Sequence, residues 1–200
     1  APAIRAWTGL PVQVMVSMEA SRYVDAGVPP LAGRNRGLLV VAVSNSGEAA
    51  RLVEATQRLR NLPQVTVAAI NGACAGAGLS LALACDLLYA SEKAKLGLPE
   101  VTLAVIPGFG GTQRLTRLVG RNRAKELVFT GDAIDAAKAK EIGLALEVLA
   151  PEALLPRCKE IAHKIASRGP VALAQAKRVM EAGADLPLKD ANEIERQAFG

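Results

Sequence analysis

A run of small residues is the part of this sequence best suited to bind a developing negative charge. Residues 71–86 read Asn-Gly-Ala-Cys-Ala-Gly-Ala-Gly-Leu-Ser-Leu-Ala-Leu-Ala-Cys-Asp, so glycine and alanine lead directly into an apolar helix. Small side chains leave backbone N–H groups uncovered at a helix N-terminus, where the helix dipole favours negative charge. An oxyanion hole uses this arrangement. Close packing of a helix against a sheet explains the same composition, so the run alone leaves both interpretations open.

Hydroxyl groups gather in a second run, Ser44-Asn45-Ser46-Gly47, between an apolar strand and a helix. These hydroxyls and the first N–H groups of the helix could hold a phosphate. The alternative is a plain helix cap, with Ser46 as the capping residue and Glu48 in the first turn. Spacing alone favours the cap.

Cysteine and histidine give little support to metal or nucleophilic chemistry. Cys74, Cys85 and Cys158 are an odd number without C-x-x-C spacing, and each lies in an apolar or helical context typical of a reduced, buried thiol. We therefore expect a reducing compartment and a cytoplasmic location. His163 is the single histidine. With no second histidine or cysteine nearby, we expect neither a metal site nor a Ser/His pair.

Length and composition favour one compact α/β domain over residues 1–200. Half of the residues are apolar but only 3% are aromatic, so Ala, Val, Leu, Ile and Gly must build the core. The net charge of +5 comes from scattered Lys and Arg, which suits a phosphate-bearing ligand better than nucleic acid. The N-terminus lacks a signal-peptide profile, and the longest uncharged stretch is short and Gly-rich, so no membrane partner is expected.

Apolar periodicity predicts a parallel sheet built from βα units and followed by a helical C-terminal part. The β-branched runs at 12–17, 37–43 and 65–70 are typical of buried strands, with a helix at 48–60. One late strand is expected at 145–149. Beyond Pro107, Gly and Pro punctuate six expected helices, at 112–118, 121–129, 136–141, 152–167, 170–182 and 188–199.

From residue 62 to residue 199 the chain resembles the enoyl-CoA hydratase/isomerase (crotonase) superfamily. The motifs occur in family order: Asn71-Gly72, the small-residue turn, Ala84-Cys85-Asp86, Pro99-Glu100-Val101, and Ile-Pro-Gly-x-Gly-Gly-Thr-Gln-Arg-Leu at 106–115. The resemblance implies a crotonase-like core and a coenzyme A thioester as substrate, with no separate cofactor. It implies that two backbone N–H groups hold the thioester carbonyl during acid/base chemistry on the acyl chain. A homo-oligomer is compatible with it.

The resemblance also assigns roles to particular residues. Glu100 is the expected catalytic carboxylate, and desolvation in the acyl pocket would raise its pKa towards working pH. Ala77 is expected to supply one oxyanion N–H. The expected substrate-binding residues are Gly76, Gly78, Pro107 and Gly108.

The sequence departs from the family at three places. Ser80 stands where hydratases carry a second Glu, and a hydroxyl cannot serve as a proton reservoir near pH 7. An upstream Ala-Gly-Ala-Asp segment, which supplies the other oxyanion N–H, is absent, and the chain ends at Gly200, short of a closing C-terminal helix. We therefore expect an impaired enzyme, acting as a single-carboxylate isomerase or a weak hydratase.

Residues 1–60 instead resemble part of a sugar isomerase (SIS) phosphosugar-binding domain, whose strand, loop and helix read Ser-x-Ser-Gly-Glu-Thr. Ser44, Ser46 and Gly47 would then form a phosphate loop. Residues 1–61 contain seven Arg and no Lys, whereas residues 62–200 contain eight Arg and nine Lys. An inactive recombined or engineered chimera, with an SIS-like segment at 1–61 and a crotonase-like segment at 62–200, is one hypothesis. A divergent natural crotonase is the other.

Overall fold

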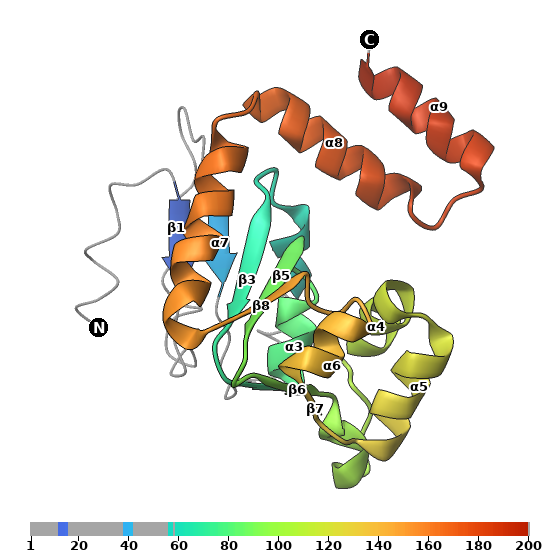
Figure 1. The fold of residues 1–200 in the computed structure, drawn as a ribbon. Coiled ribbons are helices and arrows are strands. Elements are labelled where there is room, and N and C mark those ends of the chain that lie inside the picture. Colours follow the sequence, from blue (N-terminus) through green and yellow to red (C-terminus); the bar gives the residue numbers. More distant parts are fainter. Residues whose placement is uncertain (1–11, 16–37, 42–55, 58, 200) are drawn as a thin grey trace.

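A five-stranded parallel sheet forms the centre of the fold (Figure 1). The structure, a computed structural model, describes residues 12–15, 38–41, 56–57 and 59–199. The strands lie in the order β1, β2, β3, β5, β8, and each neighbouring pair is parallel. Their bounds are β1 Val12–Met15, β2 Leu38–Val41, β3 Thr66–Ile70, β5 Leu87–Ser91 and β8 Glu147–Leu149. The predicted α/β class with a parallel sheet is confirmed.

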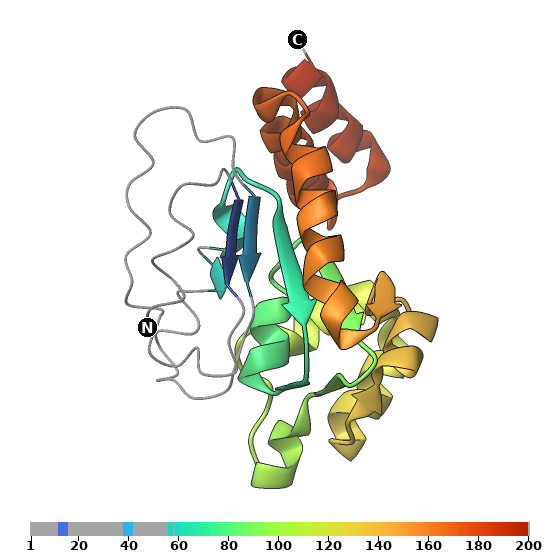
Figure 2. The ribbon, with the colours of Figure 1, turned by 60° about the vertical axis from the view of Figure 1, so that its left-hand side comes forward.

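Strand β3 is buried throughout, and four of its five residues are apolar, because helices cover both of its faces. Val67 and Ala69 pack with Tyr89 against helix α7 (Pro151–Ala166) through Leu154, Cys158 and Ala162. The alternate residues Ala68 and Ile70 face a larger cluster that includes Leu79 and Leu81 of helix α3 (Ala77–Ala82). Figure 2 shows α7 running along its side of the sheet. The sequence predicted this strand within one residue.

A second, three-stranded sheet lies below the first and was not predicted. It consists of β4 (Ala73–Ala75), β6 (Lys95–Gly97) and β7 (Ile134–Asp135). Strands β4 and β6 are parallel, whereas β6 and β7 are antiparallel. These strands read Ala-Cys-Ala, Lys-Leu-Gly and Ile-Asp, too short for local propensity to give a signal. The pairing of β4 with β6 fixes the backbone that enters α3.

The helices after residue 107 begin and end within one residue of the predicted positions. Gly120 and Gly131 end two of them with φ of +82° and +71°, a conformation that glycine adopts without strain. A short 3-10 helix, η2 (Pro99–Leu103), precedes them. The helices are α4 Gly111–Val119, α5 Arg121–Thr130, α6 Ala136–Glu141, α7 Pro151–Ala166, α8 Pro170–Gly183 and α9 Leu188–Phe199.

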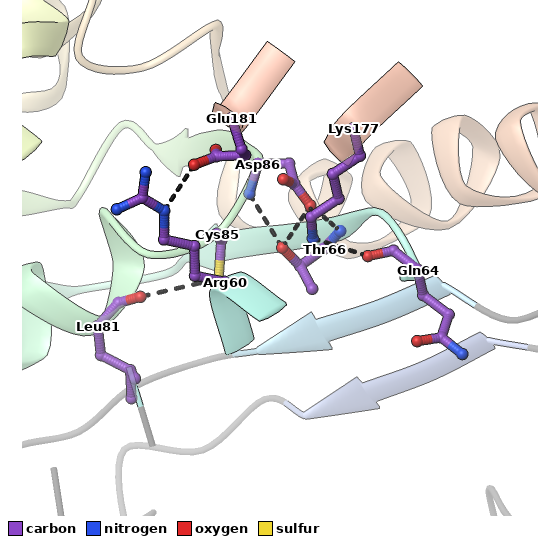
Figure 3. Close-up of polar contacts among 8 residues, drawn as sticks. All are labelled: Arg60, Gln64, Thr66, Leu81, Cys85, Asp86, Lys177 and Glu181. Carbon is purple, nitrogen blue, oxygen red and sulfur yellow. Dashed lines mark hydrogen bonds and ion pairs between the residues drawn. The ribbon is translucent and has the colours of Figure 1, made fainter. Parts of the chain in front are cut away.

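Helix α8 is attached to the sheet by a largely buried ion pair (Figure 3). Asp86 Oδ2 accepts hydrogen bonds from Thr66 N–H (2.6 Å), Thr66 Oγ1 (2.7 Å) and Lys177 Nζ (2.8 Å). Lys177 also donates to the Gln64 carbonyl at 2.9 Å. The two charged side chains are only 8% and 19% exposed, and no residue of α8 is fully buried. Polar contacts therefore attach α8 to the sheet, whereas apolar packing attaches α7.

We predict that Lys177→Met destabilises the fold by about 2–3 kcal/mol, because Asp86 would remain partly buried without its cation. Methionine keeps the aliphatic stem. Urea unfolding followed by circular dichroism measures the change. Arg60→Met is the matched control, since it breaks the exposed Arg60–Glu181 pair on the same helix, and should cost less than about 1 kcal/mol. Equal losses in the two variants would contradict the assignment.

Candidate active site

The turn that enters helix α3 brings exposed backbone and a carboxylate together. Gly76 precedes the helix with φ of +57°, which a residue with a side chain rarely adopts. Its N–H donates to the Gly97 carbonyl at 2.9 Å, so strand β6 holds the turn in place. Ala77 is the first residue of α3 and is half-buried, while Gly78 is buried. The N–H of Ala77 has no acceptor within its helix, as expected at a helix N-terminus.

Glu100 lies against this turn. A Cβ built on Gly76 would stand 3.4 Å from Glu100 Oε1, an ordinary van der Waals distance, so it is the positive φ and not space that requires glycine there. Glu100 is held in η2, directly after the fully buried Leu98 and a proline that begins the 3-10 helix. The structure therefore places Gly76 and Glu100, which are distant in sequence, side by side, with Ala77 next in the chain.

The carboxylate of Glu100 is desolvated. Both of its oxygens are buried and lack a hydrogen-bond partner within the described part of the chain. This burial raises the pKa of Glu100 above its ordinary value, with a weak opposing effect from its own backbone N–H. A raised pKa moves a carboxyl group towards neutral pH, and general acid/base catalysis is most effective when the pKa lies near the working pH.

The loop after Glu100 is tied back to it. Val105 N–H donates to the Glu100 carbonyl at 3.2 Å. Pro107 is fully buried and Gly108 is exposed. Their predicted contact with substrate, like that of Gly78, stays a prediction. Ser44, Ser46 and Gly47 lie outside the described residues.

Arg114 fixes the end of this loop, a role that sequence reasoning missed. Its Nη1 donates to the Phe109 carbonyl at 2.8 Å, and the guanidinium lies where a Cβ on Gly110 would be, 2.5 Å from Nη1. Burial lowers the pKa of Arg114, although the group stays charged. The available sequence signal was the pair Gly110-Gly111 with Arg114 four residues after Gly110.

The cysteines do not supply a nucleophile. Cys74, Cys85 and Cys158 are buried free thiols, as predicted, and burial raises the pKa of each to about 12. Within the described ranges, no three His, Cys, Asp or Glu side chains gather where they could hold a metal ion. Over the same ranges, every helix is too short or too polar to cross a membrane.

The matches to known proteins include every residue of this site from Gly76 to Arg114. The sequence pattern of the enoyl-CoA hydratase/isomerase family matches residues 44–200. YngF of Bacillus subtilis is 50% identical over 153 residues, which are 76% of this chain and 59% of YngF. The short-chain-enoyl-CoA hydratase of Clostridium acetobutylicum is 44% identical over 144 residues, 72% of this chain and 55% of the hydratase. The chain thus spans little more than half the length of these relatives.

A solved structure has the same fold. The crystal structure of enoyl-CoA hydratase from Bacillus anthracis superposes with a TM-score of 0.78 at 39% identity, over 81% of this chain and 71% of that one. The crotonase-like core is confirmed. The family match begins at residue 44 and so includes residues 44–61, which were expected to belong to the SIS-like segment. Nothing in these comparisons supports an SIS domain, a chimera or an impaired enzyme.

We predict that Glu100→Gln makes the protein more stable than the wild type at neutral pH. Because the folded-state pKa of Glu100 is raised, its stabilising contribution is present below the unfolded pKa of about 4.3 and is lost as pH rises through the folded pKa. The gain in melting temperature should therefore grow as the pH rises above about 4 and level off once the pH passes the folded-state pKa. Glu92→Gln, at an exposed turn, is the control. A gain that is largest in acid would contradict the assignment.

Proposed function

The chain belongs to the enoyl-CoA hydratase/isomerase family, and from that premise we propose that it binds an acyl-CoA thioester and moves protons on the acyl chain with Glu100. The observation that carries the proposal is the buried Glu100 carboxylate, which has no hydrogen-bond partner among the described residues and lies against the turn at Gly76 and Ala77. The thioester is itself the substrate, so the reaction needs no separate cofactor.

Backbone at the start of α3 is proposed to stabilise the charge that the reaction creates. The thioester carbonyl oxygen would accept a hydrogen bond from Ala77 N–H as enolate character develops, and an oxyanion hole is most effective at that stage. Gly76 and Gly78 have no side chains to obstruct the approach of the thioester. A second donor is not assigned among residues 59–199.

Isomerisation is the reaction that a single carboxylate performs most simply. In a 3-enoyl-CoA, Glu100 would take a proton from C2, leaving a dienolate, and would return the proton to C4 as the double bond moves to C2–C3. The substrate and Glu100 therefore each carry the same number of protons before and after the reaction. Hydration also requires a water molecule to be positioned and deprotonated, for which hydratases of the family use a second Glu. Since Ser80 stands at that position, we propose an isomerase with weaker hydratase activity.

The first test is Glu100→Gln, which should lower turnover of 3-enoyl-CoA by about 10²–10⁴-fold, the usual contribution of a general acid/base. Binding should survive, because only proton transfer is lost. Crotonyl-CoA should therefore raise the melting temperature of the variant as much as that of the wild type. Glu92→Gln should leave turnover unchanged. Unaltered turnover in Glu100→Gln would rule out Glu100 as the acid/base.

The second test compares the two reactions on one sample of wild-type protein. Turnover of 3-enoyl-CoA to the 2-enoyl isomer should exceed hydration of crotonyl-CoA at matched concentrations, because hydration lacks its second carboxylate. Steady-state spectrophotometry of the conjugated thioester follows both reactions. Faster hydration would show that another group replaces the missing Glu. Binding without either reaction would favour a protein that holds acyl-CoA but does not transform it.

A further inference from the structure

The guanidinium of Arg114 lies where a cation costs folding free energy. It reaches back over Gly110, the residue that precedes α4, so a Cβ on Gly110 would meet Arg114 Nη1 at 2.5 Å and Cζ at 3.0 Å. The helix dipole disfavours positive charge at this end of a helix. The Nε atom of Arg114 is also buried, without a hydrogen-bond partner among the described residues. Stability alone therefore does not explain an arginine at this position.

The charges around Arg114 do not offset this cost. Burial lowers the pKa of Arg114, and the neighbouring cation Arg60 lowers it further, while Glu181 opposes both effects. Glu181 already pairs with Arg60, at 2.6 Å from its Nε atom. One carboxylate thus serves two guanidinium groups. The geometry around Arg114 points to another reason for its position.

One connection leads from Arg114 to Glu100 along the loop between them. Arg114 Nη1 donates to the Phe109 carbonyl at 2.8 Å, which holds the end of the loop. The start of the loop is bonded to Glu100 itself, because Val105 N–H donates to the Glu100 carbonyl at 3.2 Å. Pro107, between these two bonds, is fully buried. The loop is therefore tied to Arg114 at one end and to Glu100 at the other.

A second connection passes through Gly111, the first residue of α4. A Cβ on Gly111 would stand 3.3 Å from both δ-carbons of Leu98 and 2.6 Å from Ser80 Oγ, so the helix backbone packs directly on these side chains. Ser80 Oγ is buried and has no hydrogen-bond partner within the described part of the chain. Leu98 is fully buried and lies two residues before Glu100. The start of α4 therefore supports the segment that carries Glu100.

We propose that Arg114 is a positioning residue, which holds the Glu100 carboxylate against the turn at Gly76 through the loop and through the start of α4. The planar guanidinium bonds the Phe109 carbonyl with one nitrogen while it packs on Gly110, which the ammonium group of a lysine does not reproduce. The positioning stands on this geometry, whereas its meaning for catalysis rests on the proposed function.

The charge of Arg114 and the position it imposes would act on Glu100 in opposite directions. A nearby cation favours an ionised carboxylate, so loss of charge alone would raise the pKa of Glu100 or leave it unchanged. Loss of position would admit solvent and lower that pKa. Burial is the main cause of the raised pKa of Glu100, and no charged side chain in the described ranges contributes to it. The charged residues of α5, which packs against η2, are all exposed: Arg121, Arg123, Lys125 and Glu126.

The test is Arg114→Met, which keeps an aliphatic side chain and removes the guanidinium. Protein labelled with ¹³C at the glutamate carboxyl reports the titration of Glu100, whose signal is assigned by its loss in Glu100→Gln. The titration midpoint of Glu100 should move down in Arg114→Met. Arg117→Met is the matched control, since it removes the same charge from the next turn of α4, where Arg117 forms an exposed pair with Asp185. It should leave the midpoint unchanged.

Turnover of 3-enoyl-CoA gives the second readout. In Arg114→Met, kcat should fall by up to about 10²-fold with little change in KM, because a misplaced acid/base loses rate and not substrate. Arg117→Met should leave kcat unchanged. An unchanged or raised midpoint in Arg114→Met would overturn the proposal, and so would an unchanged kcat.

Should Arg114→Met fail to fold by circular dichroism, Arg114→Lys takes its place. This variant keeps the charge and one donor, so a smaller downward shift of the Glu100 midpoint is expected, and no shift would overturn the proposal. The midpoint needs no substrate. A wild-type protein without turnover would therefore count against the proposed function, while the midpoint would still decide whether Arg114 positions Glu100.

Discussion

The absence of a side chain at Gly76 is the constraint on which the site depends. With φ of +57°, Gly76 turns the chain from β4 into α3, and its N–H is held by Gly97 of β6. The Glu100 carboxylate lies against this turn, 3.4 Å from where a Cβ on Gly76 would stand. The small second sheet therefore positions the turn that carries Ala77, the proposed backbone donor, next to Glu100, the proposed acid/base. A methyl group at position 76 would strain the turn against which Glu100 lies.

The surroundings of Glu100 illustrate how a protein maintains an unfavourable group. An ionised carboxylate without partners costs folding free energy, and so does a buried hydroxyl. Two apolar clusters on the faces of the main sheet stabilise the scaffold around them. Burial of the Glu100 carboxylate raises its pKa and also costs folding free energy, so both effects have the same origin.

Sequence reasoning succeeded where the signal was local. Gly and Pro marked the helix ends to within one residue, and the family motifs singled out both Gly76 and Glu100, which the structure places side by side. It failed for β4, β6 and β7, which are strands only because they pair with each other. It could not find the Asp86–Lys177 pair across 91 residues, nor the Ser80–Gly111 contact. The SIS resemblance rested on a short motif that also fits a plain helix cap.

Helices α8 and α9 form a C-terminal hairpin, and the way it is attached determines which part of the molecule unfolds first. Helices α8 and α9 pack mainly against each other, and neither contains a fully buried residue. The described contacts that hold them to the body are polar: the Asp86–Lys177 pair, the Lys177–Gln64 bond, and the exposed Arg60–Glu181 and Arg117–Asp185 pairs. The hairpin can therefore detach as one cooperative unit while β3 and α7 stay packed. Amide hydrogens in α8 and α9 would exchange through that local opening, and a protease would reach the hairpin before it reached the core.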